Sequence, residues 1–169
     1  CHQSLVDGQG RNIFFDPQDE FHLSPTAYGF IAGQLAHARG LSALLAPSVN
    51  SYKRLVPGYE APVYIAWAQI NRSALIRIPR YTAGMDRATR AELRCPDPSC
   101  NPYLAFAVML AAALDGIDRR LPAPKPMNNI NLYHLTLAER KRLKIAEIPG
   151  SLAEALTELE RDELLKAAL

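Results

Sequence analysis

The residues with the clearest chemical potential lie between positions 72 and 94, where arginine is concentrated. This stretch holds six arginines against two carboxylates, Asp86 and Glu92, a local net charge of +4 in a chain whose formal total is +2. The arginines are Arg72, Arg77, Arg80, Arg87, Arg90 and Arg94. A guanidinium group presents a planar fork of donors that matches phosphate and carboxylate oxygens. The stretch therefore predicts an anion-binding surface.

Two expected strands decide which of these charges share a surface. Because successive side chains of a strand point to opposite faces, residues two apart lie together. In the strand expected over 73–78, Arg77 lies on the face opposite to Ile76 and Ile78. The residues that share one face of the second strand, expected over 90–95, are Arg90, Glu92 and Arg94. If the two strands are neighbours in one sheet, their guanidinium groups surround a single carboxylate.

That carboxylate, Glu92, has a chemical use in such surroundings. Mg²⁺ commonly binds through one or two carboxylates together with substrate phosphates. Phosphoryl transfer needs this combination, because it depends on positioning and charge neutralisation rather than on covalent chemistry by the protein. The alternative interpretation is a solvated strand face whose Arg–Glu pairs are structural. The pattern alone leaves both open.

A second source of charged groups is the segment 48–62, which contains two prolines and a glycine and shows no sustained hydrophobic period. We expect a long loop there, and long loops in compact domains commonly carry function. The charged residues of this loop are Lys53, Arg54 and Glu60. His2 and Ser4 are expected on one face of a first strand. Incidental surface charge in the loop, and a histidine that serves packing, remain the alternatives.

Local sequence signals mark the ends of the helices and strands that must position these groups. Ser24-Pro25 places a capping side chain before an N1 proline, which predicts a helix that runs to about Arg39 and is closed by Gly40. A short second helix is expected over 41–46. The strands expected elsewhere lie over 3–6 and 11–15, as a hairpin, and over 63–67.

Asn101-Pro102 repeats the capping signal and opens the most apolar helix, expected over 103–114 and ending near Gly116. Because this helix has few polar faces, we expect it to be a central core element. Capping boxes at Thr136 and Ser151, each with a glutamate three residues on, predict short helices over 137–143 and 152–160.

Composition bounds the class of protein. The chain has 169 residues, 49% of them hydrophobic, which suits one domain with a core that needs no disulfides. A net charge of +2 is small for a nucleic-acid-binding protein, and no run approaches the ~18 apolar residues of a membrane helix, so neither partner is expected. Three cysteines, an odd number without zinc-site spacing, indicate a reduced, cytoplasmic setting. A chain that opens on Cys1 is interpreted as an excised segment.

Several motifs taken together carry a family resemblance. The longest is the thirteen-residue run from Asn50 to Pro62, NSYKRLVPGYEAP. The others, in chain order, are His2-Gln3-Ser4-Leu5, Asn71-Arg72-Ser73, Arg77-Ile78-Pro79, the stretch from Glu92 to Pro98, and Asn101-Pro102-Tyr103-Leu104-Ala105-Phe106. In order and spacing these resemble the catalytic domain of glutamine synthetase, and the resemblance extends to the tail that ends at Leu169.

The resemblance implies an α+β fold, an antiparallel β-sheet with packed helices of the glutamine synthetase and guanido kinase-like kind. It implies that residues 1–169 are the C-terminal part of that catalytic domain, with the N-terminal domain and the start of the catalytic domain absent. The complete enzyme is then expected to be a homo-oligomer, a dodecamer, whose sites form between subunits. The segment alone is expected to be inactive, because the aspartate that deprotonates ammonium and several metal-binding residues lie upstream.

The activity implied is ligation of ammonia to L-glutamate with ATP, through γ-glutamyl phosphate, to give L-glutamine. By the matching motifs, His2, Ser4, Arg72 and Arg77 would contact ATP, with Arg72 also stabilising the transferring phosphoryl group. Arg54 and Arg94 would bind glutamate, Glu60 would close over the site and help to bind ammonium, and Glu92 would ligate Mg²⁺ or Mn²⁺. Tyr133 matches in position a tyrosine that some bacterial members adenylylate, but its neighbours resemble those of unmodified members.

Two alternatives stay open within the resemblance. A γ-glutamylpolyamine-type ligase would use the same phosphoryl chemistry with a different acceptor pocket. A non-catalytic structural descendant would keep the fold, but it should have lost some of the charged site residues, which all stand in this chain.

Overall fold

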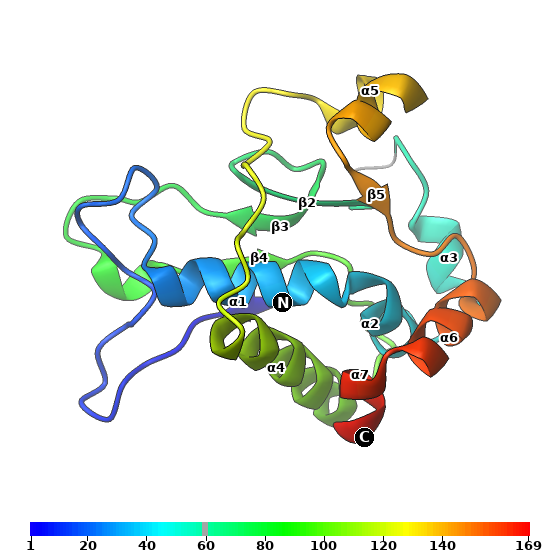
Figure 1. Cartoon of the computed structure of the whole chain (residues 1–169), viewed down its shortest axis with the longest axis horizontal. Helices are drawn as coiled ribbons and strands as arrows, with labels where there is room; N and C mark the ends of the chain where they lie inside the picture. The colour runs from blue at the N-terminus through cyan, green and yellow to red at the C-terminus, as the bar shows by residue number, and fades with distance from the viewer. Residues whose placement is uncertain (59–60) are drawn as a thin grey trace.

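The computed structural model describes residues 1–58 and 61–169. Its five-stranded sheet has the order β1-β4-β3-β2-β5 (Figure 1). The strands are β1 (His2–Gln3), β2 (Tyr64–Gln69), β3 (Ala74–Ile78), β4 (Ala91–Leu93) and β5 (Ala146–Glu147). The helices are α1 (Pro25–Ala36), α2 (Ala38–Leu45), α3 (Ser51–Arg54), α4 (Pro102–Asp118), α5 (Leu137–Arg142), α6 (Leu152–Arg161) and α7 (Glu163–Ala167), with short 3₁₀ turns at Asp86–Ala88 and Leu132–His134. The predicted α+β class with packed helices is confirmed.

The sheet is mixed, so the prediction of an antiparallel sheet is wrong for one pair of strands. β1–β4, β3–β4 and β2–β5 are antiparallel, but β2 and β3 run parallel, with Tyr64 beside Ala74 and Gln69 beside Ile78. The segment 70–73 does not form a hairpin. It runs back along β2, so that β3 begins beside the first residue of β2 and runs in the same direction.

α1 and α4 cross in direct backbone contact on the helical side of the molecule (Figure 1). A methyl group at Gly33 would collide with the carbonyl oxygen of Ala112, and one at Gly116 would collide with the carbonyl oxygen of Gly29. Both helices begin as predicted: Ser24 accepts from the backbone N–H of Ala27, and Asn101 caps α4. Glycine is therefore required at this crossing because no side chain fits between the helices.

Several predicted boundaries shift. α1 ends at Ala36, and His37, rather than Gly40, separates it from α2, while Gly40 is buried within α2 against Leu165 and Asp162. The hairpin predicted near the N-terminus is present but short: Val6 bridges Asn12, and the N–H groups of Asp7 and Ile13 donate to the carbonyl oxygens of Arg11 and Leu5. The preceding residues, β1, pair with β4. The predicted loop over 48–62 contains the short helix α3.

α4 is only half buried, so its prediction as a central core element is wrong for its outer face. Its inner face, which includes Val108, Met109 and Ala112, is buried against the core. Its outer face exposes Tyr103 to 84% and Phe106 to 58%. Periodicity could not separate the two faces, because both are apolar.

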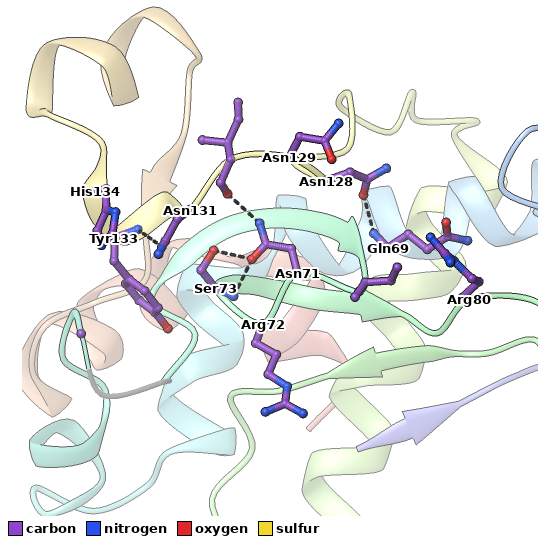
Figure 2. Close-up of a pocket in the computed structure, with 13 residues that line it drawn as sticks. Gln69, Asn71, Arg72, Ser73, Arg80, Asn128, Asn129, Asn131, Tyr133 and His134 are labelled. Carbon is purple, nitrogen blue, oxygen red and sulfur yellow. Dashed lines mark hydrogen bonds between the residues drawn. The ribbon is translucent and has the colours of Figure 1, made fainter.

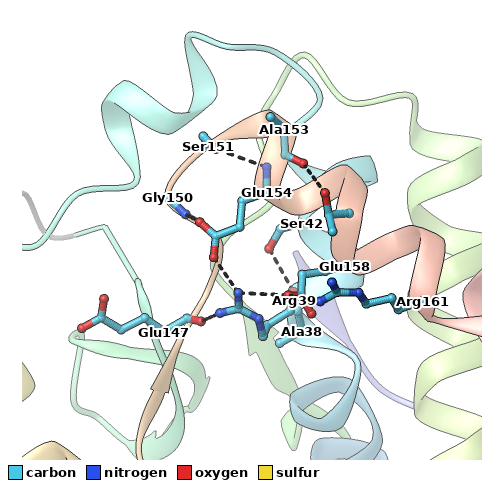
Figure 3. Close-up of polar contacts among 11 residues, drawn as sticks. Ala38, Arg39, Ser42, Glu147, Gly150, Ser151, Ala153, Glu154, Glu158 and Arg161 are labelled. Atoms are coloured by element: carbon cyan, nitrogen blue, oxygen red, sulfur yellow. Dashed lines mark hydrogen bonds and ion pairs between the residues drawn. The ribbon is translucent and has the colours of Figure 1, made fainter.

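Arg39 of α2 ties β5 and α6 to α2 (Figure 3). Its guanidinium donates to the carbonyl oxygen of Glu147 at 2.6 Å and pairs with Glu154 at 2.6 Å and Glu158 at 3.3 Å. The capping box predicted at Thr136 is complete. At Ser151 only half forms, because the Glu154 carboxylate accepts from the N–H of Gly150. Within the described residues, no helix is long and apolar enough to cross a membrane.

Candidate active site

The site is built around Glu92, the middle residue of β4. Sheet register places Glu92 opposite Arg77 of β3 on one side and opposite His2 of β1 on the other. Arg77 donates through Nε and Nη2 to Oε2, both at 2.6 Å. His2 Nε2 lies 3.2 Å from Oε1. The pairing predicted from strand alternation is therefore present, because residues directly opposite on neighbouring strands bring their side chains together.

Arg90 completes this group, which we call the Glu92 cluster: His2, Arg77, Arg90 and Glu92. Arg90 Nη2 lies 3.1 Å from Oε1 of Glu92. Glu92 is only 4% exposed, and a carboxylate that is withdrawn from water needs such partners. Arg90 was not among the predicted site residues, although its alternation with Glu92 along the strand was the signal that pointed to it.

A divalent cation fits the Glu92 cluster only in part. A buried carboxylate oxygen is the kind of ligand that Mg²⁺ prefers, and Oε1 faces His2, which is itself exposed. Among residues 1–58 and 61–169, no group of three or more His, Cys, Asp and Glu side chains could hold a metal ion. Glu92 can therefore supply one ligand to a site that substrate oxygens and further residues must complete.

A second group of cationic side chains lies where β3 begins and β4 ends. Arg94 Nη1 donates to the backbone carbonyl oxygen of Arg72 and also reaches that of Ala74 at 3.4 Å. Arg54, which ends α3, donates through Nη2 to the carbonyl oxygen of Cys95 at 2.7 Å. The guanidinium groups of two predicted arginines, Arg54 and Arg94, are thereby held by backbone carbonyl oxygens, one of which belongs to the third, Arg72. This end of the sheet therefore gathers three arginines from distant parts of the chain.

The remaining predicted residues are Ser4, Glu60 and Arg72. Ser4 is exposed just beyond β1, two residues from His2. Glu60 lies outside the described residues. Arg72 is exposed at the start of β3 and lines a cavity of about 860 Å³.

That cavity lies between the segment 69–73 and the segment 128–134 (Figure 2). Amide side chains, including those of Gln69, Asn71 and Asn128, make up much of its wall, together with Arg72 and Arg80. No carboxylate is found among the described residues that line it. Its polarity and charge suit polar or anionic groups.

Cys95 lies next to these arginines but is not a nucleophile. It is 2% exposed, and burial raises the pKa of its thiol from 9.0 to about 12. Because the thiolate is the reactive form, the Cys95 thiol is inert at neutral pH. Cys95 is therefore a packing residue beside the arginines.

Comparison with known proteins gives one consistent match. The family model described as "Glutamine synthetase, catalytic domain" matches residues 1–169. The chain is 57% identical over 168 residues to a glutamine synthetase of Thermus thermophilus. This match covers 99% of the present chain and 36% of the Thermus protein. It is 55% identical over 170 residues to one of Methanocaldococcus jannaschii, again covering 36% of that protein.

A solved structure agrees. A protein named "GmaS/ADP complex-Conformation 1" superposes with a TM-score of 0.83 at 39% identity, and the match covers 99% of this chain and 37% of that one. The chain thus spans little more than a third of the length of these relatives.

Proposed function

Because the chain belongs to the glutamine synthetase family, through that family's catalytic domain, we propose that it is the C-terminal part of this domain in a longer enzyme. That enzyme joins ammonia to L-glutamate at the expense of ATP and releases L-glutamine. The observation that carries the proposal is the Glu92 cluster beside the arginines at the end of the same sheet. We assign the first group to a polyphosphate and the second to a dicarboxylic amino acid, which the charges of the two groups support.

The reaction has two steps in this proposal. An oxygen of the glutamate γ-carboxylate attacks the terminal phosphorus of ATP, and ADP leaves. Ammonia then attacks the γ-carbonyl carbon of γ-glutamyl phosphate, and phosphate leaves. Negative charge gathers on the transferring group in the first step, so fixed guanidinium groups that need no reorganisation lower its barrier.

Each predicted residue has a role in this scheme. His2, Ser4 and Arg77 contact ATP, and Arg72 stabilises the transferring phosphoryl group. Arg54 and Arg94 hold the carboxylates of glutamate. Glu60 closes over the site, helps to bind ammonium, and keeps water, the competing nucleophile, from the acyl phosphate.

Glu92 would hold Mg²⁺ or Mn²⁺ together with phosphate oxygens. When bound, such an ion would supply positive charge that neutralises the phosphate oxygens. Arg77 and Arg90 support this role by fixing the Glu92 carboxylate in one orientation.

The complete protein acts as a homo-oligomer in the cytoplasm, a dodecamer in which a neighbouring subunit completes each site. Its substrates are glutamate, ATP and ammonium, and neither nucleic acid nor a membrane takes part.

Oxygen tracing tests the proposal. The complete enzyme is incubated with ATP, Mg²⁺, ammonium and glutamate labelled with ¹⁸O in its γ-carboxylate, and the released phosphate is analysed by mass spectrometry. We expect one labelled oxygen in each phosphate, because the bridging oxygen comes from glutamate. Unlabelled phosphate would contradict an acyl phosphate intermediate, and preference for a polyamine over ammonium would identify the γ-glutamylpolyamine-type ligase instead.

A further inference from the structure

The connection between β2 and β3 is unusually short for a parallel pair. Parallel neighbours are generally joined by a dozen or more residues, but here only the segment 70–73 lies between Gln69 and Ala74. The segment opens with Ile70 at φ 77°, a left-handed conformation that β-branched residues rarely adopt. We call the segment 70–73 the β2–β3 return. A connection this short needs side-chain contacts to hold its shape.

Asn71 supplies those contacts with four hydrogen bonds from its side chain. Figure 2 shows those to Ile130 and Ser73. Nδ2 donates to the carbonyl oxygens of Met127 at 2.6 Å and Ile130 at 2.7 Å. Oδ1 accepts from the backbone N–H of Ser73 at 3.0 Å and from its hydroxyl at 2.7 Å. The side chain thus ties the return to the segment 127–130, far away in sequence.

These bonds occupy the whole capacity of the amide. A carboxamide has two N–H groups and two acceptor lone pairs, and all four are used by the protein. The hydroxyl of Ser73 extends the tie by accepting from the N–H of Leu132 at 3.2 Å. Asn71 therefore has no bond left for a substrate, so any effect on the reaction must pass through its neighbours.

The neighbours are two arginines of the proposed site. Arg72 lies between Asn71 and Ser73, so the return sets where its side chain leaves the backbone. The carbonyl oxygen of Arg72 accepts from Arg94, which also bonds that of Ala74. The shape of the segment 70–73 thus sets where the Arg72 side chain begins and where the carbonyl oxygen that Arg94 contacts lies.

We propose that Asn71 is a positioning residue for the ligase reaction: it holds the β2–β3 return in the shape that places Arg72 against the transferring phosphoryl group and Arg94 against glutamate. The inference depends on the proposed function for what these arginines bind. Asn71 itself does not touch substrate.

The first test compares Asn71→Asp with Gln9→Glu in the complete enzyme. Asp in place of Asn71 keeps the size of the side chain but turns an acceptor toward the carbonyl oxygens of Met127 and Ile130. Gln9 is exposed in the turn near the N-terminus and does not line the cavity, so it receives the same amide-to-carboxylate change without the contacts. We expect Asn71→Asp to lower kcat at least about tenfold and raise the KM for glutamate about tenfold, with Gln9→Glu within about twofold of wild type. A merely structural role would reduce kcat through the folded fraction and leave KM unchanged.

The second test is a double-mutant cycle with Arg72→Ala. If Asn71 acts through Arg72, then Asn71→Ala should change kcat less than about twofold once Arg72 is already absent, although it costs about tenfold alone. Fully additive effects on kcat would overturn the proposal.

Should the Asn71 variants fail to fold, Ser73→Ala keeps the proposal testable. This substitution removes the hydrogen bond from the Ser73 hydroxyl to Asn71 Oδ1 and the one that the hydroxyl accepts from Leu132, while both bonds donated by Asn71 remain. We expect the KM for glutamate to rise about three- to tenfold, which is the size of effect that the loss of one or two buried hydrogen bonds produces. Unchanged kinetics in Ser73→Ala would then count against the inference. A wild-type enzyme that forms no glutamine would instead contradict the proposed function, so the two failures are distinguishable.

Discussion

At the scale of single residues, Glu92 shows how one carboxylate organises several cations. It is buried, and its two oxygens contact three basic side chains that come from three different segments. Leaving such a carboxylate without partners would cost several kcal/mol, so the pairs also fix the positions of Arg77 and Arg90. A site that must bind polyanions gains from this arrangement, because the guanidinium groups are oriented before the ligand arrives.

Arg72 gives the sharpest residue-scale prediction. Arg72→Ala in the complete enzyme should lower kcat by at least ~100-fold, since losing a charge-assisted contact to the transferring phosphoryl group costs ~3 kcal/mol or more in the barrier. Steady-state kinetics with saturating ATP and glutamate measure the effect. Arg142→Ala, at an exposed arginine of α5, is the matched control and should retain wild-type turnover. Near-normal turnover in Arg72→Ala would remove Arg72 from the mechanism.

Cys95 gives a prediction about pH. Burial raises the pKa of its thiol to about 12 from 9.0, so the folded state holds the thiol proton more tightly than the unfolded state does. The stability that follows is fully present below pH 9 and is lost as the pH rises toward 12. In native protein at pH 8.5, we expect iodoacetamide to leave Cys95 unmodified, as measured by peptide mass spectrometry. In urea the same residue should react fully, and rapid modification of the native protein would show that the thiol is accessible.

At the scale of elements, the crossing of α1 and α4 depends on glycine. Alanine is the better helix former by ~0.5–1 kcal/mol, which alone would favour Gly33→Ala. The added methyl group would collide with backbone of the facing helix, and rigid backbone cannot move aside cheaply. The collision outweighs the gain in helix propensity, so the substitution destabilises the protein.

We therefore expect Gly33→Ala to destabilise the protein by ~1–3 kcal/mol, the usual cost of overpacking a core. The change in the denaturant midpoint measures it. Gly8→Ala is the control, because a Cβ there has nothing within 4 Å, and its midpoint should stay near that of wild type. Equal midpoints for the two variants would mean that the helices separate without cost.

At the scale of the whole molecule, the described chain holds only some of the groups that the proposed reaction needs. It brings together arginines for anions and one carboxylate, but its described residues offer no group of three ligands for a metal. The apolar outer face of α4 is exposed as well, with Tyr103 and Phe106 open to solvent. The chain also spans little more than a third of the relatives that it matches.

The whole-molecule prediction is that these 169 residues by themselves have no γ-glutamyl transfer activity. The reason is that a cationic sheet face can bind anions but cannot supply the remaining metal ligands or the base that ammonium requires. The assay measures glutamine formation with the isolated chain at high concentration beside the complete enzyme. Measurable turnover by the isolated chain would show that its site is already sufficient.

The sequence by itself determined the features that depend on interactions between residues close together in the chain. Ser24 and Asn101 cap their helices as predicted, because a cap is made by residues two or three apart. Strand alternation placed Arg77 and Glu92 each on the charged face of its strand, although only the structure showed that the two strands are neighbours. The match of motifs pointed to the family that the comparisons found. The roles assigned to the site residues stay predictions.

Tertiary structure alone decided which distant segments meet. Neither the parallel pairing of β2 with β3 nor the tie from Asn71 to Met127 follows from local pattern, since the same strand would alternate identically in either direction. The break at His37 and the exposed face of α4 have the same origin. These features are set by contacts between segments far apart in the chain, whose energies are summed over many residues, whereas caps and alternation need only the nearest few.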